Sequence, residues 1–133
     1  MTLQPMWRVS VQVPLAALDA VRAGILALDA LAAGGYDSGL FEQAVGIEQY
    51  RPLPDTDAAH GQAGQVQRVP SVCLSFHLPC DAARLERIVE CGIAPHHPWH
   101  HPLIEVVPVQ LYLRDQSRPA LRSQRHRVVR ETW

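Results

Sequence analysis

The stretch from Trp7 to Gly35, WRVSVQVPLAALDAVRAGILALDALAAGG, predicts a strand followed by a helix. In its first half, apolar and polar residues alternate with a period of two, which is typical of a strand with one buried face. Pro14 ends the alternation, and proline is favoured in the first turn of a helix. Apolar residues then recur at spacings of three and four from Leu15 to Leu31, which predicts an amphipathic helix that ends at Gly34-Gly35.

The same order of signals occurs a second time between Ser71 and Gly92. Apolar residues alternate with small or polar ones up to Leu78, and Pro79 closes this second predicted strand. A helix ending at Gly92 follows, with apolar positions at Leu85, Ile88 and Val89. Strand, proline, helix and glycine therefore appear twice.

The remaining segments complete the pattern. Residues 36–44 are a candidate strand, and residues 45–69, rich in Gly, Pro, Asp and Gln, are predicted to form a long loop. Residues 103–113 predict the last strand, with Pro108 indicating an edge position or a bulge. A loop of this length in a small domain is usually functional or disordered.

The predicted order is βαββαβ, an α+β fold of the ferredoxin-like type. We expect a four-stranded antiparallel sheet with two helices on one face. With 133 residues and 47% hydrophobic content, the chain has material for one core. We therefore predict a single domain over residues 1–113, followed by an arginine-rich extension over residues 114–133.

Composition narrows the function classes. No apolar run approaches the roughly 20 residues of a membrane-spanning helix, and the first seven residues do not resemble a secretory signal, so we expect a cytoplasmic protein without a membrane partner. The cysteines Cys73, Cys80 and Cys91 are odd in number and widely spaced, which favours neither disulfides nor a zinc knuckle. The chain has no lysine, which excludes a phosphate-binding P-loop.

The arginines are distributed unevenly. The formal net charge is −1, yet half of the arginines follow Leu113, where only Asp115 and Glu131 oppose them. Such a tail could contact nucleic acid or an acidic protein partner. No aromatic or glycine pattern of a nucleic-acid module accompanies it, so we favour a solvated tail over nucleic-acid binding.

The sequence HHPWHHP, residues 96–102, concentrates four of the seven histidines. Neutral imidazoles ligate Zn, Ni and Cu well. The candidate metal ligands are His96, His97, His100, His101 and Glu105. The alternative is a turn that shapes the entry to the last strand, with Trp99 packing as an anchor.

A second candidate site is Tyr50-Arg51-Pro52. An arginine fork binds phosphate or carboxylate through two parallel hydrogen bonds, and its neighbours here restrict its freedom. Tyr50, Arg51 and Trp99 are therefore the candidate ligand-binding residues, with a small anion as the ligand. Alternatively, Arg51 stacks on Tyr50 or pairs with an acidic residue.

We predict no catalytic residues. Cys73 and His77 lie on one face of the second long strand, but residues four apart on a strand are about 13 Å from each other. That separation is far beyond the reach of a nucleophile and its base. Packing or subunit contact is the favoured role.

Several of these motifs together resemble a known family. His97-Pro98-Trp99-x-x-Pro102 resembles the His-Pro-Tyr-Glu-x-Pro turn of the PII-like domain of the NIF-three family, and more distantly the CutA proteins. Gly35-Tyr36-Asp37 and Gly46-x-x-x-Tyr50-Arg51-Pro52 resemble two further motifs of that domain. The resemblance covers roughly residues 7–113. It departs at Trp99, where the family has tyrosine, and at His100, where it has an acid.

The resemblance implies a free-standing PII-like domain that assembles as a homotrimer. The last strand independently favours assembly, because it is apolar on both sides and two helices cover only one face of such a sheet. The expected function is a non-catalytic oligomer that binds a small ligand or a divalent metal ion. The alternative is a protein-interaction or regulatory module that uses the 45–69 loop and the arginine-rich tail, with an enzyme third.

Overall fold

The computed structural model describes residues 1–54 and 64–115. The strands are β1 (Thr2–Pro14), β2 (Phe41–Glu42), β3 (Gly46–Tyr50), β4 (Gln67–Pro79) and β5 (Ile104–Leu113). Helix α1 spans Leu18–Leu28 after a 3-10 turn at Leu15–Ala17, and helix α2 spans Ala82–Arg87. A π-helical segment, Ile88–Ile93, and a 3-10 turn, Ala94–His96, continue α2.

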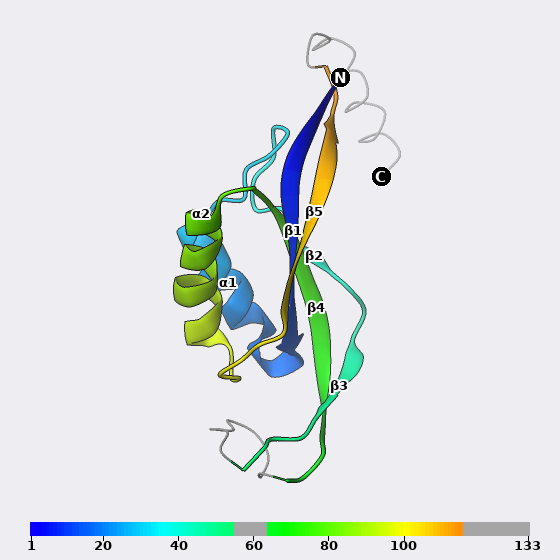
Figure 1. Ribbon diagram of the computed structural model, residues 1–133, viewed down its shortest axis with the longest axis vertical. Coiled ribbons are helices and arrows are strands. Elements are labelled where there is room, and N and C mark those ends of the chain that lie inside the picture. The colour runs from blue at the N-terminus through cyan, green and yellow to red at the C-terminus, as the bar shows by residue number, and fades with distance from the viewer. Residues whose placement is uncertain (55–63, 116–133) are drawn as a thin grey trace, which may run out of the picture.

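All strands belong to one antiparallel sheet, and both helices lie on the same face of it (Figure 1). The strand order is β2-β4-β1-β5, and β3 also pairs with β4. This arrangement confirms the predicted α+β, ferredoxin-like class. The helices cover only the middle of the sheet, and the paired ends of β1 and β5 extend beyond them (Figure 1).

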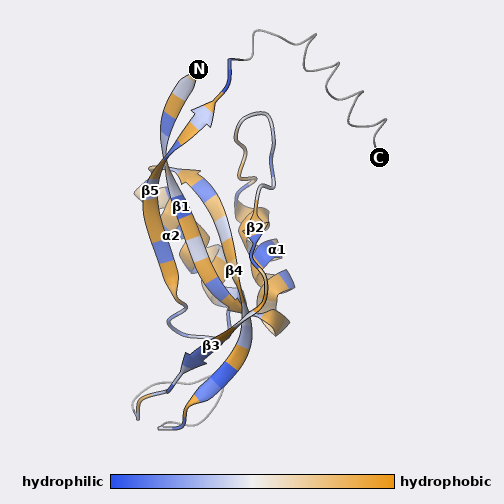
Figure 2. Cartoon of the chain, turned by 90° about the vertical axis from the view of Figure 1, so that its right-hand side faces the viewer, coloured by the Kyte–Doolittle hydropathy of each residue, from blue (hydrophilic) through white to orange (hydrophobic). Residues whose placement is uncertain are grey.

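Strand β1 is central, with Val9 paired to Phe76 on β4 and to Val106 on β5. The predicted alternation places its valines toward the helices, where they form the core with the alternate residues of β4. The buried core comprises Val9, Val11, Val13, Leu18, Val21, Ile25, Leu31, Val72, Leu74, Phe76, Leu78, Ile88 and Ile93. Figure 2 shows the resulting apolar and polar banding along β1 and β4.

We call the opposite side of the sheet the open face, because neither helix lies on it (Figure 1). The register places Arg8, Ser10 and Gln12 there, beside His77, Ser75 and Cys73 of β4. On β5 the open face carries an apolar strip of half-buried residues, Val107, Val109, Leu111 and Leu113. The open face is thus polar in the middle and apolar along one edge.

Helix α1 ends at Leu28, six residues before the predicted end at Gly34-Gly35. Asp29 leaves the helix in an extended conformation, and its carboxylate accepts a hydrogen bond from the Leu31 N–H at 2.9 Å. Arg84 holds the same carboxylate from α2, with Nη2 at 2.7 Å from Oδ1. Leu31 then has a φ of 53°. Side-chain hydrogen bonding therefore stops a helix that the apolar spacing would continue.

The second helical segment includes the predicted positions Leu85, Ile88 and Val89, but it runs past the predicted end at Gly92. The Asp81 carboxylate caps α2 by accepting from the Arg84 N–H at 3.1 Å. Helix α1 meets the π-helical segment at Gly24 and Gly92, where a Cβ on Gly24 would lie 2.3 Å from the Gly92 carbonyl oxygen. Glycine at position 24 therefore sets the distance between the two helical segments.

The region between the two repeats differs from prediction. The candidate strand at 36–44 shortens to β2, and the predicted loop at 45–69 contains β3 and the first residues of β4. β3 pairs with the extended start of β4, from Gly46 opposite Ser71 to Tyr50 opposite Gln67. Polar residues form these strands because backbone pairing along β4, rather than burial, stabilises them.

The position of Pro108 at an edge strand agrees with prediction, because β5 is the last strand on its side of the sheet. No helix in the described part of the chain is long and apolar enough to cross a membrane. Of the predicted extension at 114–133, only Arg114 and Asp115 are described. Residues 55–63 of the predicted loop also lie outside the described ranges.

Candidate functional site

The 97–102 turn is held to the sheet by His97, which is 7% exposed. Its Nδ1 accepts the Trp99 backbone N–H at 3.0 Å, so Nε2 carries the proton and donates to the Gln12 carbonyl oxygen at 2.7 Å. Burial lowers the pKa of His97, which keeps the ring neutral. The ring therefore ties the turn to the end of β1.

The other candidate metal ligands lie apart from His97. His96 packs over Gly24 on the helix side, whereas the register puts Glu105 on the open face beside Ser10. His100 and His101 are exposed, with ring centroids 4.5 Å apart. Within residues 1–54 and 64–115, no three His, Cys, Asp or Glu side chains are grouped closely enough to hold a metal ion. Both ring nitrogens of His97 are engaged, which leaves it no lone pair for a metal in this arrangement.

Two of the three candidate ligand-binding residues come together. The Tyr50 and Trp99 rings lie 4.8 Å apart and are tilted by 57°. Burial raises the pKa of Tyr50. Trp99 also lines an apolar hollow of about 570 Å³ beside the start of α1, together with Leu15 and Pro98. Arg51 follows Tyr50 directly and is exposed.

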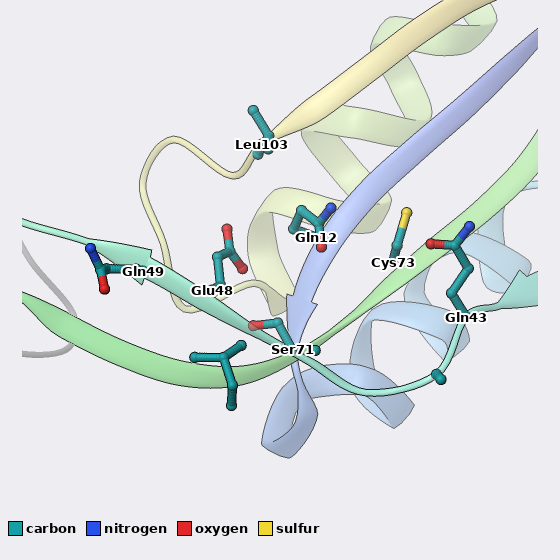
Figure 3. A pocket seen from close by; sticks show the side chains of 10 residues that line it. Gln12, Gln43, Glu48, Gln49, Ser71, Cys73 and Leu103 are labelled. Atoms are coloured by element: carbon teal, nitrogen blue, oxygen red, sulfur yellow. The ribbon is translucent and has the colours of Figure 1, made fainter.

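A polar pocket of about 330 Å³ opens on the open face between β1, β3 and β4 (Figure 3). Its lining residues are Gln12, Gln43, Ala44, Gly46, Ile47, Glu48, Gln49, Ser71, Cys73 and Leu103. β3 provides Glu48, and β4 provides Ser71 and Cys73 from the same face of the strand. Carboxyl, carboxamide, hydroxyl and thiol groups therefore surround one space.

Two groups in this pocket lack partners. Ser71 is only 4% exposed, and neither its Oγ nor the buried Oε1 of Glu48 has a hydrogen-bond partner within the described residues. Burial raises the pKa of Glu48, and the neighbouring Ser71 hydroxyl lowers it by a smaller amount. Buried polar groups without partners are costly, so they mark this pocket as a place where a partner is missing.

Sequence reasoning missed this pocket because it assigned residues 45–69 to a loop. The residues of β3, Gly46–Tyr50, do not alternate between apolar and polar, and nothing local indicates that Glu48 shares a pocket with Ser71. Cys73, Ser75 and His77 do lie on one face, in register with Gln12, Ser10 and Arg8. Burial, together with the charge of Arg8, lowers the pKa of His77.

Comparisons with known proteins identify the fold. No protein-family model and no curated protein matches this sequence. Among solved structures, a Bacillus cereus protein related to NIF3 is 22% identical with a TM-score of 0.61 over 82% of this chain, which spans only 27% of that protein. CutA1 from Oryza sativa is 18% identical with a TM-score of 0.53, and CutA from Xylella fastidiosa is 14% identical with a TM-score of 0.50. The match to the Oryza sativa protein includes 84% of this chain, and the match to the Xylella fastidiosa protein includes 83% of it. Each match covers 86% of the CutA protein.

The resemblance predicted from the turn and strand motifs is thus confirmed for the fold. Sequence identities of 14–22% support a shared fold and no more than that. Each of the three structures matches more than four fifths of this chain, and the match covers 86% of each CutA protein. This chain has the PII-like fold that NIF3-related and CutA proteins share.

Proposed function

We propose that this chain is a non-catalytic, PII-like protein that assembles as a homotrimer and binds a small ligand. The observation that supports it is the open face, whose apolar strip (Val107, Val109, Leu111 and Leu113) is half-buried and has no helix over it. A second copy packed on the strip would remove it from water. Closure around a three-fold axis does this for every subunit at once.

The test of assembly is sedimentation equilibrium. The expected mass is about three times 14.8 kDa. Val109→Asp should dissociate the assembly because it introduces a charge into the strip. Val66→Asp is the matched control, since Val66 is 57% exposed and lies outside the strip. A parent protein that is monomeric at micromolar concentration contradicts the proposed trimer.

The proposed ligand site consists of Tyr50, Arg51 and Trp99. The tilted Tyr50–Trp99 pair provides an aromatic wall, and Arg51, the next residue along the chain, is exposed and can bind an anion such as phosphate. Native mass spectrometry of untagged protein reports retained small molecules and stoichiometry together. The Arg51→Gln variant should no longer bind phosphate. The Arg68→Gln variant is the control and should still bind it, because Arg68 donates a hydrogen bond to Gln49 and is not part of the proposed site.

Metal binding remains part of the proposal, with His100 and His101 as the ligands of first choice. Their rings are adjacent and exposed, and a second subunit would complete the coordination. Zn, Ni or Cu should bind less tightly as the pH falls, because protonation removes the ligating lone pair. A His100→Ala, His101→Ala double variant should lose the metal. Equal metal titration of the parent and the double variant would end this part of the proposal.

A protein-interaction module is the second candidate function. Large apolar side chains from β2 to the end of β3 and beyond are exposed, namely Phe41 (64%), Val45 (54%), Ile47 (57%) and Leu53 (60%). They overlap the predicted 45–69 segment that this alternative uses. Replacing Phe41 and Leu53 with serine separates the two candidates, because it should abolish capture of a protein partner and leave phosphate binding unchanged.

A further inference from the structure

The polar pocket on the open face has the composition of a binding site and is separate from the residues of the proposed anion site. Among the residues that the structure describes, its lining includes one carboxyl group, the carboxamides of Gln12, Gln43 and Gln49, the Ser71 hydroxyl and the Cys73 thiol, and no basic side chain. The close view shows Glu48, Ser71 and Gln12 around one space (Figure 3). Its charge therefore selects against anions.

The unpartnered groups define what is missing. Within the described residues, the buried Oε1 of Glu48 has no hydrogen-bonded donor, and the polar group beside it is the hydroxyl of Ser71, a residue that is 4% exposed. A buried carboxylate becomes stable when a hydrogen-bonding cation pairs with it. The missing partner is therefore a donor group, preferably one that carries positive charge.

The chemistry of a carboxylate favours one kind of cation. A carboxylate and a planar amidinium or guanidinium form two parallel hydrogen bonds, whereas an ammonium presents a point charge. The remaining N–H groups of such a head can donate to the glutamine side-chain oxygens. Leu103 and Ile47 add apolar wall to the same pocket, which suits the weakly hydrated faces of a planar cation.

We propose that this pocket binds a small organic cation with an amidinium or guanidinium head, paired with Glu48 and assisted by Ser71 and Gln12. The volume of about 330 Å³ is at the small end of the range for ligand pockets, about 300–1,000 Å³, so the ligand is a small molecule. Every lining residue comes from one chain. Arg51 is not among these residues, so the site is distinct from the proposed anion site.

The experiment uses benzamidine as the probe and benzamide, its neutral counterpart of the same shape, as the control ligand. Isothermal titration of the full chain should show one benzamidine per chain, and benzamide should bind at least tenfold more weakly. Glu48→Gln should lower benzamidine affinity at least tenfold, because it removes the charge and keeps the shape. Glu86→Gln, a change at an exposed acid on α2, should leave the affinity unchanged.

Cys73 gives a second readout, because its thiol lines the pocket. In a Cys80→Ser, Cys91→Ser background, benzamidine should slow alkylation of Cys73, and benzamide should not. Melting curves of Glu48→Gln establish that the variant is folded.

The proposal is overturned by equal binding of benzamidine and benzamide, by unchanged benzamidine affinity in Glu48→Gln, or by the absence of benzamidine binding. If benzamidine does not bind and Glu48→Gln disrupts the oligomer, Glu48 pairs with a second copy instead. Failure of the Arg51 phosphate test leaves each of these outcomes unaffected.

Discussion

The two faces of the sheet are formed by the same strands but differ in burial and polarity. Toward the helices, Val9, Leu74 and Phe76 are at most 1% exposed, and each is surrounded by apolar neighbours. On the open face, the residues between them in sequence are polar, and β5 adds an apolar strip that no helix covers. The two helices of this chain can cover one face of its sheet. The other face stays available for ligands or for other subunits.

The contrast extends to polar groups. In the 97–102 turn, His97 has both ring nitrogens paired. In the pocket on the open face, Glu48 Oε1 and Ser71 Oγ have no partner within the described residues. Satisfied groups stabilise a fold, whereas unsatisfied ones make binding favourable. The following predictions test this division between a structural face and a binding face.

The largest effect is expected in the core. Phe76→Ala should lower the free energy of unfolding by about 3–5 kcal/mol, because it leaves a cavity beneath the helices. Ser75→Ala, one residue away on the open face, should change it by no more than about 0.5 kcal/mol. Urea denaturation of both variants measures the difference. Similar losses in the two variants would contradict the division.

The contact between the helical segments should be the next most sensitive position. Gly24→Ala should lower stability by about 1–3 kcal/mol, because the new Cβ would overlap the Gly92 carbonyl oxygen and the His96 ring. Gly39→Ala is the matched control, since a Cβ placed there would lie within 4 Å of no described residue other than its chain neighbours. Thermal unfolding compares the two. A fully stable Gly24→Ala protein would show that the helices can separate without cost.

A smaller effect concerns pH. Because burial lowers the pKa of His97 in the folded protein, the unfolded chain takes up a proton as the pH falls below about 6.5 and the folded protein does not. Stability should therefore decrease from pH 6.5 downward until the lowered pKa is reached, with no contribution from this group above pH 6.5. His97→Gln should remove this component, and His101→Gln should retain it. Urea midpoints measured between pH 5 and pH 8 provide the check.

The smallest effect is a gain. Burial raises the pKa of Glu48, so the folded carboxyl resists ionisation, and stability is lost as the pH rises through the window above 4.5, the ordinary pKa. Glu48→Gln should raise the stability of the ligand-free protein at pH 7 by less than about 1 kcal/mol, because Glu48 is only half-buried and water screens its charge. The gain should disappear at pH 4. A loss at pH 7 would mean that the Glu48 carboxylate already has a structural partner.

Much of the fold was predictable from the sequence. Short-range patterns predicted three features: the alternating valines of β1, the repeated strand–proline–helix–glycine order, and Pro108 at the edge of the sheet. Such patterns can be read from residues that are close together in the sequence. The short turn HPWHHP likewise indicated where the last strand begins. These features specified the ferredoxin-like class before any contact was known.

Only the tertiary structure decided the site. The early end of α1 depends on Arg84 reaching Asp29 across 55 positions of sequence, and the paired His97 depends on a carbonyl of β1. The pocket requires β3 to pair with β4, because the pairing of Gly46 with Ser71 and of Glu48 with Val69 brings the Glu48 and Ser71 side chains into one pocket. The apolar–polar period of a strand determines which face of the sheet each residue occupies. How deeply a residue is buried and how close it lies to its partner depend on strand register, which is fixed by backbone pairing between distant parts of the sequence.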